Sequence, residues 1–67
     1  MLRIEIEREE DGRWIAEVPA LPGVLAYGIT VDEARTRVTA LALRVIADRL
    51  EHGEPVPFNP QDFFVAA

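Results

Sequence analysis

Cysteine is absent from this 67-residue chain, and histidine occurs once, at position 52. A disulfide framework is therefore excluded, and so are the usual cysteine and histidine ligand sets of a structural zinc site. A chain of this length forms one domain, spanning 1–67, and folding hides only about 60% of the surface that the unfolded chain exposes. Small domains need some additional stabilisation. Since disulfides and a structural zinc site are excluded, association with another subunit is the remaining source of it.

Serine is also absent, and the chain has only three threonines. Without serine or cysteine the common nucleophiles of hydrolases are missing, so we expect no enzyme activity, no catalytic residue and no cofactor. His52 is expected only to end a helix, where the dipole favours a cation. Glu5 and Glu7 share one face of a strand and could hold Mg²⁺ in a metal-dependent nuclease, but alternate charges on a solvated strand face are the commoner case, so we expect no metal site.

Lysine is absent too, so all seven basic residues are arginines, against twelve acidic residues and a net charge of -5. An acidic chain without a basic cluster is poorly suited to a phosphate backbone and well suited to a basic protein partner. We therefore expect no direct binding to nucleic acid. Arginine in place of lysine is typical of some heat-adapted proteins, and genomic base composition explains it equally well.

Long apolar runs are missing as well, although 49% of the residues are hydrophobic. No window approaches the roughly 20 apolar residues that span a bilayer, and the first residues lack the apolar block of a signal peptide. The sequence predicts a soluble cytoplasmic protein that does not bind membranes.

Two strands are predicted by alternating apolar and charged residues, over Leu2–Glu7 and Trp14–Val18. A three-residue loop, Glu10–Gly12, with Gly12 in the left-handed conformation would pair Ile6 with Ala16 and Ile4 with Val18. A two-residue loop would instead mix apolar and charged side chains on both faces. The three-residue loop is therefore the predicted register.

A third strand is predicted over Val24–Ile29, after a stiff reversal at Pro19–Gly23. Its small residues alternate with large ones, so that both of its faces are apolar, and the sequence leaves open which face lies beneath a helix. Trp14 and Tyr27 are expected to pack in the core.

A helix is predicted to begin at a capping box, in which Thr30 accepts from the N–H of Glu33 and Glu33 accepts from the N–H of Thr30. Gly53 is expected to end it. The stripe facing the sheet is expected to contain Ala34, Val38, Leu41 and Val45. A second apolar strip, made of Leu43, Ile46 and Leu50, either lies under the C-terminal tail or contacts another subunit or partner.

The tail begins with a proline-rich connector over residues 54–60, which is expected to be extended. Phe63, Phe64 and Val65 then predict a short edge strand, which offers a further surface for self-association. The fold class is α+β, in the order β-β-β-α-β: three antiparallel strands plus a short edge strand, with one helix packed on one face.

The stretch from Trp14 to Ala34 resembles the motif of the HicB-like antitoxins, an aromatic start followed by "A-x-x-P-x-L-P-G" and "G-x-T-x-x-E-A". The matching positions are Trp14, Pro19, Pro22, Gly23, Gly28, Thr30, Glu33 and Ala34. The resemblance implies a partial RNase H-like fold. The sheet order would then be 3-2-1-4, with the last strand parallel to the first.

By the same resemblance, the chain would neutralise a HicA toxin, a small basic ribonuclease, by covering its RNA-binding surface and active site. The alternative is a stand-alone homo-oligomer with a structural or regulatory role. We expect a dimer or tetramer, with contacts through Leu43, Ile46 and Leu50, through Phe63–Val65, or through both. The chain corresponds to the N-terminal domain of such antitoxins, so operator binding through a DNA-binding domain is not expected.

Overall fold

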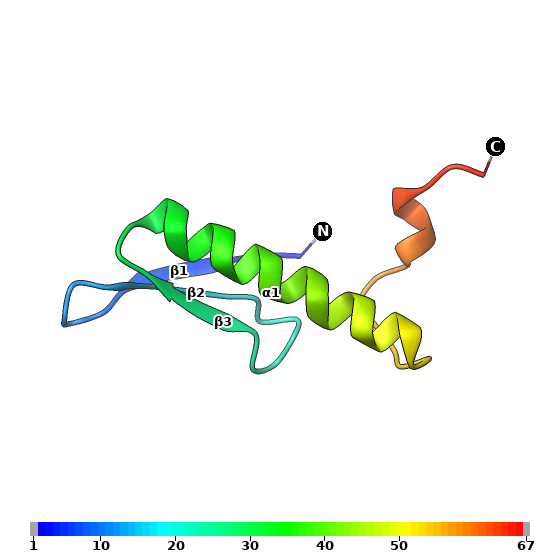
Figure 1. Ribbon diagram of the computed structural model, residues 1–67, viewed down its shortest axis with the longest axis horizontal. Helices are drawn as coiled ribbons and strands as arrows, with labels where there is room; N and C mark the ends of the chain where they lie inside the picture. Colours follow the sequence, from blue (N-terminus) through cyan, green and yellow to red (C-terminus); the bar gives the residue numbers. More distant parts are fainter. Residues whose placement is uncertain (1, 67) are drawn as a thin grey trace.

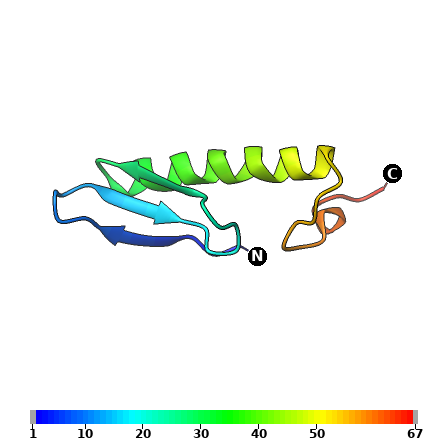
Figure 2. The same ribbon diagram turned by 90° about the horizontal axis from the view of Figure 1, so that it is seen from below.

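The computed structural model describes residues 2–66, which form three short strands, one long helix and a 3₁₀ turn. Strand β1 spans Glu5–Arg8, β2 spans Trp14–Glu17, and β3 spans Leu25–Gly28, while helix α1 spans Val31–Glu51 and the 3₁₀ turn η1 spans Pro60–Phe63. The strands form one antiparallel sheet in the order β1-β2-β3, and α1 covers one face of it (Figures 1 and 2). The α+β class is thereby confirmed.

The β1–β2 hairpin has the predicted register, because Ile6 lies opposite Ala16. The N–H of Glu9 donates to the carbonyl of Arg13 at 2.7 Å, which closes a loop of three residues, Glu10 to Gly12. Gly12 has a φ of 90°, the left-handed conformation that side chains other than glycine rarely adopt. The three-residue loop is therefore confirmed, and with it the apolar face formed by the even-numbered positions.

The reversal between β2 and β3 is held by hydrogen bonds and by one buried side chain. Val18 N–H donates to the carbonyl of Val24 at 3.0 Å, and Leu21 N–H donates to the carbonyl of Val18 at 2.9 Å. The side chain of Leu21 is fully buried, which anchors the turn in the core. Pro19 and Pro22 stay at the surface, where their missing donors cost nothing.

Both ends of α1 are capped. Glu33 N–H donates to Thr30 Oγ1 at 3.1 Å, as predicted, but the Glu33 carboxylate accepts from the N–H of Ile29, also at 3.1 Å, and not from that of Thr30. At the other end Gly53 has a φ of 68°, and the N–H of Glu54 donates to the carbonyl of Arg49 at 2.8 Å. This is a Schellman end, and it confirms Gly53 as the cap.

The core lies between the first half of α1 and the even-numbered side of the sheet. It contains small residues almost throughout: Ala16, Val18, Leu21, Val24, Ala34, Val38 and Ala42. A Cβ on Gly28 would lie 2.5 Å from the backbone nitrogen of Ala34, so the helix rests almost directly on β3. The small side of β3 is therefore the side beneath the helix. Leu41 and Val45, from the predicted stripe, are half-buried and pack against this core, while Ala42 is a buried position that the prediction missed.

Residues 54–66 form no fourth strand, so the predicted edge strand at Phe63–Val65 and the sheet order 3-2-1-4 are wrong. The 21 residues of α1 span about 31 Å. Each strand has four residues and spans only about 13 Å. The helix therefore ends beyond the sheet (Figure 1), and the tail passes Leu2 and Glu5 at Pro57 without pairing with β1.

Local sequence also directs the tail into a turn. The Asn59 side chain accepts from the N–H of Gln61 at 3.0 Å, and Pro60 occupies the first position of η1, where its fixed φ suits a helical turn. Among residues 2–66, α1 is the one helix of membrane-spanning length, and it is not apolar enough to cross a bilayer.

Candidate protein-binding surfaces

The face of the sheet turned away from α1 carries the odd-numbered side chains of the strands, and we call it the open face. Cross-strand pairing places its members in two rows across the sheet. The first row contains Glu5, Glu17 and Leu25, and the second contains Glu7, Ile15 and Tyr27. Ile15 is half-buried and the other five are exposed, so an apolar patch bordered by three carboxylates faces solvent.

The carboxylates of the open face are largely unused by the fold. Glu5 and Glu17 lie directly opposite each other on neighbouring strands, a like-charge arrangement that destabilises a sheet. Arg3 pairs with Glu5 at 3.5 Å, but within residues 2–66 Glu7 and Glu17 have no cationic side chain within ion-pairing distance. This negative charge is therefore available to a partner.

One end of the open face is held by Arg13, which links the hairpin loop to β3. Its backbone N–H and its Nε donate to the Asp11 carboxylate at 3.0 and 2.7 Å, and its guanidinium carbon lies 4.5 Å from the centre of the Tyr27 ring. The backbone hydrogen bond and then the side-chain hydrogen bond from Arg13 hold the pKa of Asp11 below its usual value of 3.8. Arg13 thus orders both the loop and the aromatic ring beside it.

The depression beside this loop does not resemble a small-molecule site. It is shallow and open to solvent, and four of its five lining residues are charged, namely Glu9, Glu10, Asp11 and Arg13, with Tyr27 as the fifth. Ligand pockets are normally enclosed and mostly apolar. The open face is therefore better suited to a protein surface than to a small ligand.

The second apolar strip of the helix is only partly as predicted. Ile46 is half-buried and packs against the core, whereas Leu43 and Leu50 are 62% and 46% exposed. The tail does not cover them, because it projects from the far end of α1 (Figures 1 and 2). Of the two alternatives, burial of this strip under the tail is therefore wrong for Leu43 and Leu50.

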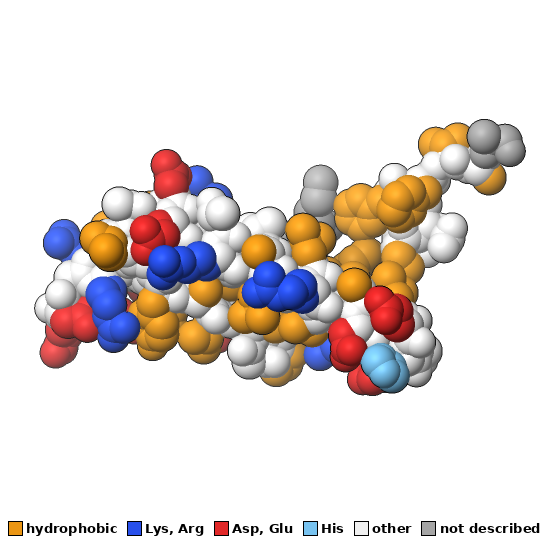
Figure 3. All heavy atoms as spheres, in the orientation of Figure 1, with side chains coloured by type: hydrophobic (Ala, Val, Ile, Leu, Met, Phe, Trp, Pro, Cys, Tyr) orange, Lys and Arg blue, Asp and Glu red, His pale blue; other side chains and the backbone are white. Residues whose placement is uncertain are grey.

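The tail residues Phe63, Phe64 and Val65 are themselves 62%, 75% and 95% exposed. Phe63 contacts Phe58 edge to face, with ring centres 5.3 Å apart. Hydrophobic side chains consequently gather on the tail as well as along the body of the molecule (Figure 3). These three residues lie in and just after η1, whereas the other three predicted contact residues lie on α1.

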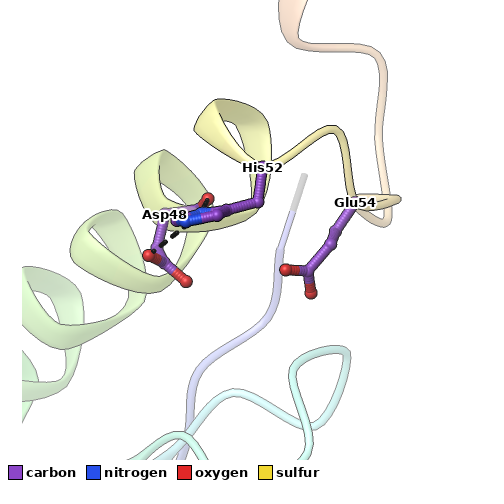
Figure 4. A group of neighbouring side chains, drawn as sticks. All are labelled: Asp48, His52 and Glu54. Atoms are coloured by element: carbon purple, nitrogen blue, oxygen red, sulfur yellow. Dashed lines mark hydrogen bonds and ion pairs between the residues drawn. The ribbon is translucent and has the colours of Figure 1, made fainter.

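Asp48, His52 and Glu54 come together at the end of α1 (Figure 4), with one potential metal-ligand atom from each lying within 4.8 Å of the others. His52 Nδ1 lies 2.7 Å from the carbonyl of Asp48 and 3.3 Å from its carboxylate. These contacts hold the His52 ring against the last turn of α1. All three side chains are exposed, so any ion held by this group would remain in contact with solvent.

Glu5 and Glu7 lie on one face of β1, as expected, and both belong to the open face.

The residues of the sequence motif all have structural roles. Gly23 and Gly28 shape the backbone, Thr30 and Glu33 cap α1, and the remaining ones lie in the core or in the turn. Trp14 is half-buried against the core, as expected, and the guanidinium of Arg8 lies over its ring at 5.6 Å. Tyr27 is not in the core as predicted, because its strand turns its small side toward α1 and leaves the ring on the open face.

Comparison with known proteins assigns the chain to a family. It is 35% identical over 52 residues to UPF0150 protein Ta0767 of Thermoplasma acidophilum, a thermophilic archaeon, and the match covers 78% of this chain and 75% of the relative. The chain therefore belongs to the UPF0150 family. No protein-family model matches it, and no solved structure matches it.

Proposed function

We propose that this UPF0150 protein is a HicB-like antitoxin, a non-enzymatic protein that binds a small basic HicA-type ribonuclease and covers its RNA-binding and active surface. The motif from Trp14 to Ala34 supports this proposal, because its prolines, glycines and capping residues coincide at the required spacing. Three antiparallel strands followed by a helix agree with the partial RNase H-like fold that the resemblance implies. The fourth strand of that fold is not formed by residues 2–66.

The open face is the observation that carries the proposal. It joins exposed apolar side chains, Leu25 and Tyr27, to carboxylates that have no use in the fold, above all Glu17. A basic RNA-binding surface needs acidic groups to neutralise it and apolar groups to hold the contact. The net charge of -5 favours the same class of partner.

The proposal is tested by mixing the purified chain with a HicA-type toxin and measuring both complex formation and cleavage of a labelled RNA. The wild-type chain should form a complex and stop cleavage. Reversing one charge of the open face, Glu17→Arg, should weaken binding at least tenfold, which corresponds to about 1.4 kcal/mol. The RNA should then be cleaved at antitoxin concentrations that protect it in the wild-type assay.

A matched control is Glu51→Arg, which makes the same change in net charge at an exposed position near the end of α1. It should leave binding within about twofold of wild type, which is a free-energy change of roughly 0.4 kcal/mol. Equal effects of the two variants would show that the open face is not the contact. Absence of any complex with the wild-type chain would remove the antitoxin proposal.

The second candidate is a stand-alone homo-oligomer with a structural or regulatory role, which the exposure of Leu43 and Leu50 favours. The same experiment separates the two functions. A chain that self-associates but neither binds nor inhibits the toxin would support this second function.

A further inference from the structure

The surface of α1 that faces away from the sheet carries a regular row of uncharged residues, which we call the outer seam. Its members are Thr36, Ala40, Leu43, Ala47 and Leu50, with successive spacings of four, three, four and three residues. All five are exposed, whereas the buried residues of α1 are Ala34, Val38 and Ala42. Alternating spacings of three and four place side chains along one line, in the pattern by which one helix packs against another.

The chain is less compact than a closed monomeric domain of its length, in part because its tail projects at the far end of α1 (Figure 2). Its radius of gyration is 13.6 Å, against about 11 Å for a compact domain of this length. Its accessible surface is 5122 Å², against about 4250 Å² for a monomeric protein of this mass. The excess of about 900 Å² is shared between the projecting tail and the exposed outer side of α1, where Leu43 and Leu50 lie, and a standard interface buries roughly 800 Å² per partner.

We propose that the outer seam binds the outer seam of a second copy of this chain, with the two helices antiparallel. In the register where Leu43 lies opposite Ala47 of the partner subunit, Leu50 lies opposite Ala40 of the partner subunit. Every leucine then faces an alanine, so the layers have similar volumes and the helices can approach closely. The two-fold axis makes the contact self-complementary, as a closed dimer requires.

A second copy is favoured over the chain's own tail as the occupant of the seam. The tail leaves the end of α1 in another direction, and Leu43 remains 62% exposed beside it. A second α1 matches the seam in length, in spacing and in the alternation of large and small residues. This contact does not depend on the proposed antitoxin function, because it lies on the opposite side of the molecule from the open face (Figure 2).

Sedimentation equilibrium of the purified chain at about 50 µM tests the proposal, since stable homodimers are populated at micromolar concentration. We expect twice the mass of one chain for the wild type. Leu43→Glu should raise the dimer dissociation constant at least tenfold, while circular dichroism shows an unchanged helix because this position is exposed. Ile29→Glu is the matched control: it places the same charge at a side chain that is 76% exposed and lies outside the seam, and it should leave the dimer intact.

A monomeric wild type at this concentration would overturn the proposal, and so would equal weakening by both variants. A higher-order oligomer that survives Leu43→Glu would show that another surface, such as the tail, is the contact.

Cysteine cross-linking tests the orientation of the helices directly, because the natural chain has no cysteine to interfere. A mixture of the Ala40→Cys and Leu50→Cys variants should form a mixed disulfide-linked dimer under mild oxidation. Neither variant alone should do so efficiently. Efficient cross-linking of Leu50→Cys with itself would indicate parallel helices and would overturn the antiparallel arrangement.

Discussion

Gly28 lies where β3 passes beneath the first turn of α1. An added Cβ would lie 2.5 Å from the nitrogen and 3.0 Å from the Cα of Ala34, and both are backbone atoms that cannot turn aside. We predict that Gly28→Ala lowers the free energy of unfolding by about 1–3 kcal/mol, since helix and sheet must separate to admit the methyl group. Urea denaturation followed by circular dichroism measures the loss.

Gly23→Ala is the comparison for this substitution. Gly23 has a φ of 86° and no heavy atom within 4 Å of the added Cβ, so only the backbone conformation opposes alanine there. The expected cost is about 1 kcal/mol. A loss at Gly28 that is no larger than the loss at Gly23 would contradict close packing of the helix on β3.

Asp11 makes the stability of the hairpin loop dependent on pH. Its pKa in the folded chain lies below the usual 3.8, because Arg13 donates two hydrogen bonds to the ionised carboxylate. The stabilisation is therefore fully present above pH 3.8 and is lost as the pH falls through the lowered pKa. We predict that wild type is more stable than Asp11→Asn at neutral pH and that the difference disappears in strong acid. Thermal unfolding of both proteins across this range measures it, and a constant difference would contradict the assignment.

Residue-scale features were predictable where the physics is local. The loop length, the glycine in it and the threonine cap follow from a few neighbouring residues, and the structure confirms all three. The second half of the capping box was less predictable. The Glu33 side chain also pairs with Arg37 at 3.1 Å, and it accepts from Ile29 and not from Thr30.

At the scale of elements, the fold depends on the contact between α1 and the sheet. Val38 lies at the centre of this contact and is fully buried, whereas Val65 in the tail is 95% exposed. We predict that Val38→Ala lowers the free energy of unfolding by roughly 2 kcal/mol, through lost burial and a residual cavity. Val65→Ala, the same chemical change, should alter it by less than about 0.5 kcal/mol. Similar losses in both variants would mean that the tail is also part of the core.

The elements themselves were largely predictable, but the position of the tail was not. Alternation and spacing fix which residues form strands and a helix, because each pattern has its own period. The course of the tail depends on the length of α1 relative to the sheet and on the turn that Asn59 and Pro60 form. The apolar character of Phe63–Val65 predicts a strand only if these residues pair with a sheet edge, and within residues 2–66 they pair with none.

At the scale of the whole molecule, the charge of -5 and the position of the glutamates determine how a partner would approach. We predict that raising salt from about 0.05 M to about 0.5 M weakens binding to the proposed basic toxin, chiefly by slowing association, because exposed charges are screened. Stopped-flow mixing at several salt concentrations measures this. Self-association through the outer seam should change much less, since its five side chains are uncharged. An association rate that is independent of salt would contradict an electrostatic role for the open face.

The set of residues that forms the open face could not have been predicted from the sequence alone. The sequence predicted Glu5 and Glu7 on one face of β1, but the partners of these glutamates depend on the order of the strands and on the side that β3 turns to the helix. The decisive signal was present in Val24, Ala26 and Gly28, whose small size permits close approach of α1. Recognising that signal would have placed Tyr27 at the surface.

The outer seam lies on the side of α1 that faces away from the sheet, and the open face lies on the far side of the sheet (Figure 2). Two chains joined through their seams therefore carry their open faces on opposite outer surfaces. Such a pair is bivalent. It would hold two molecules of the proposed toxin at once, one on each outer surface, because neither open face is used in joining the two chains. A small chain could in this way bring two copies of its partner into one assembly.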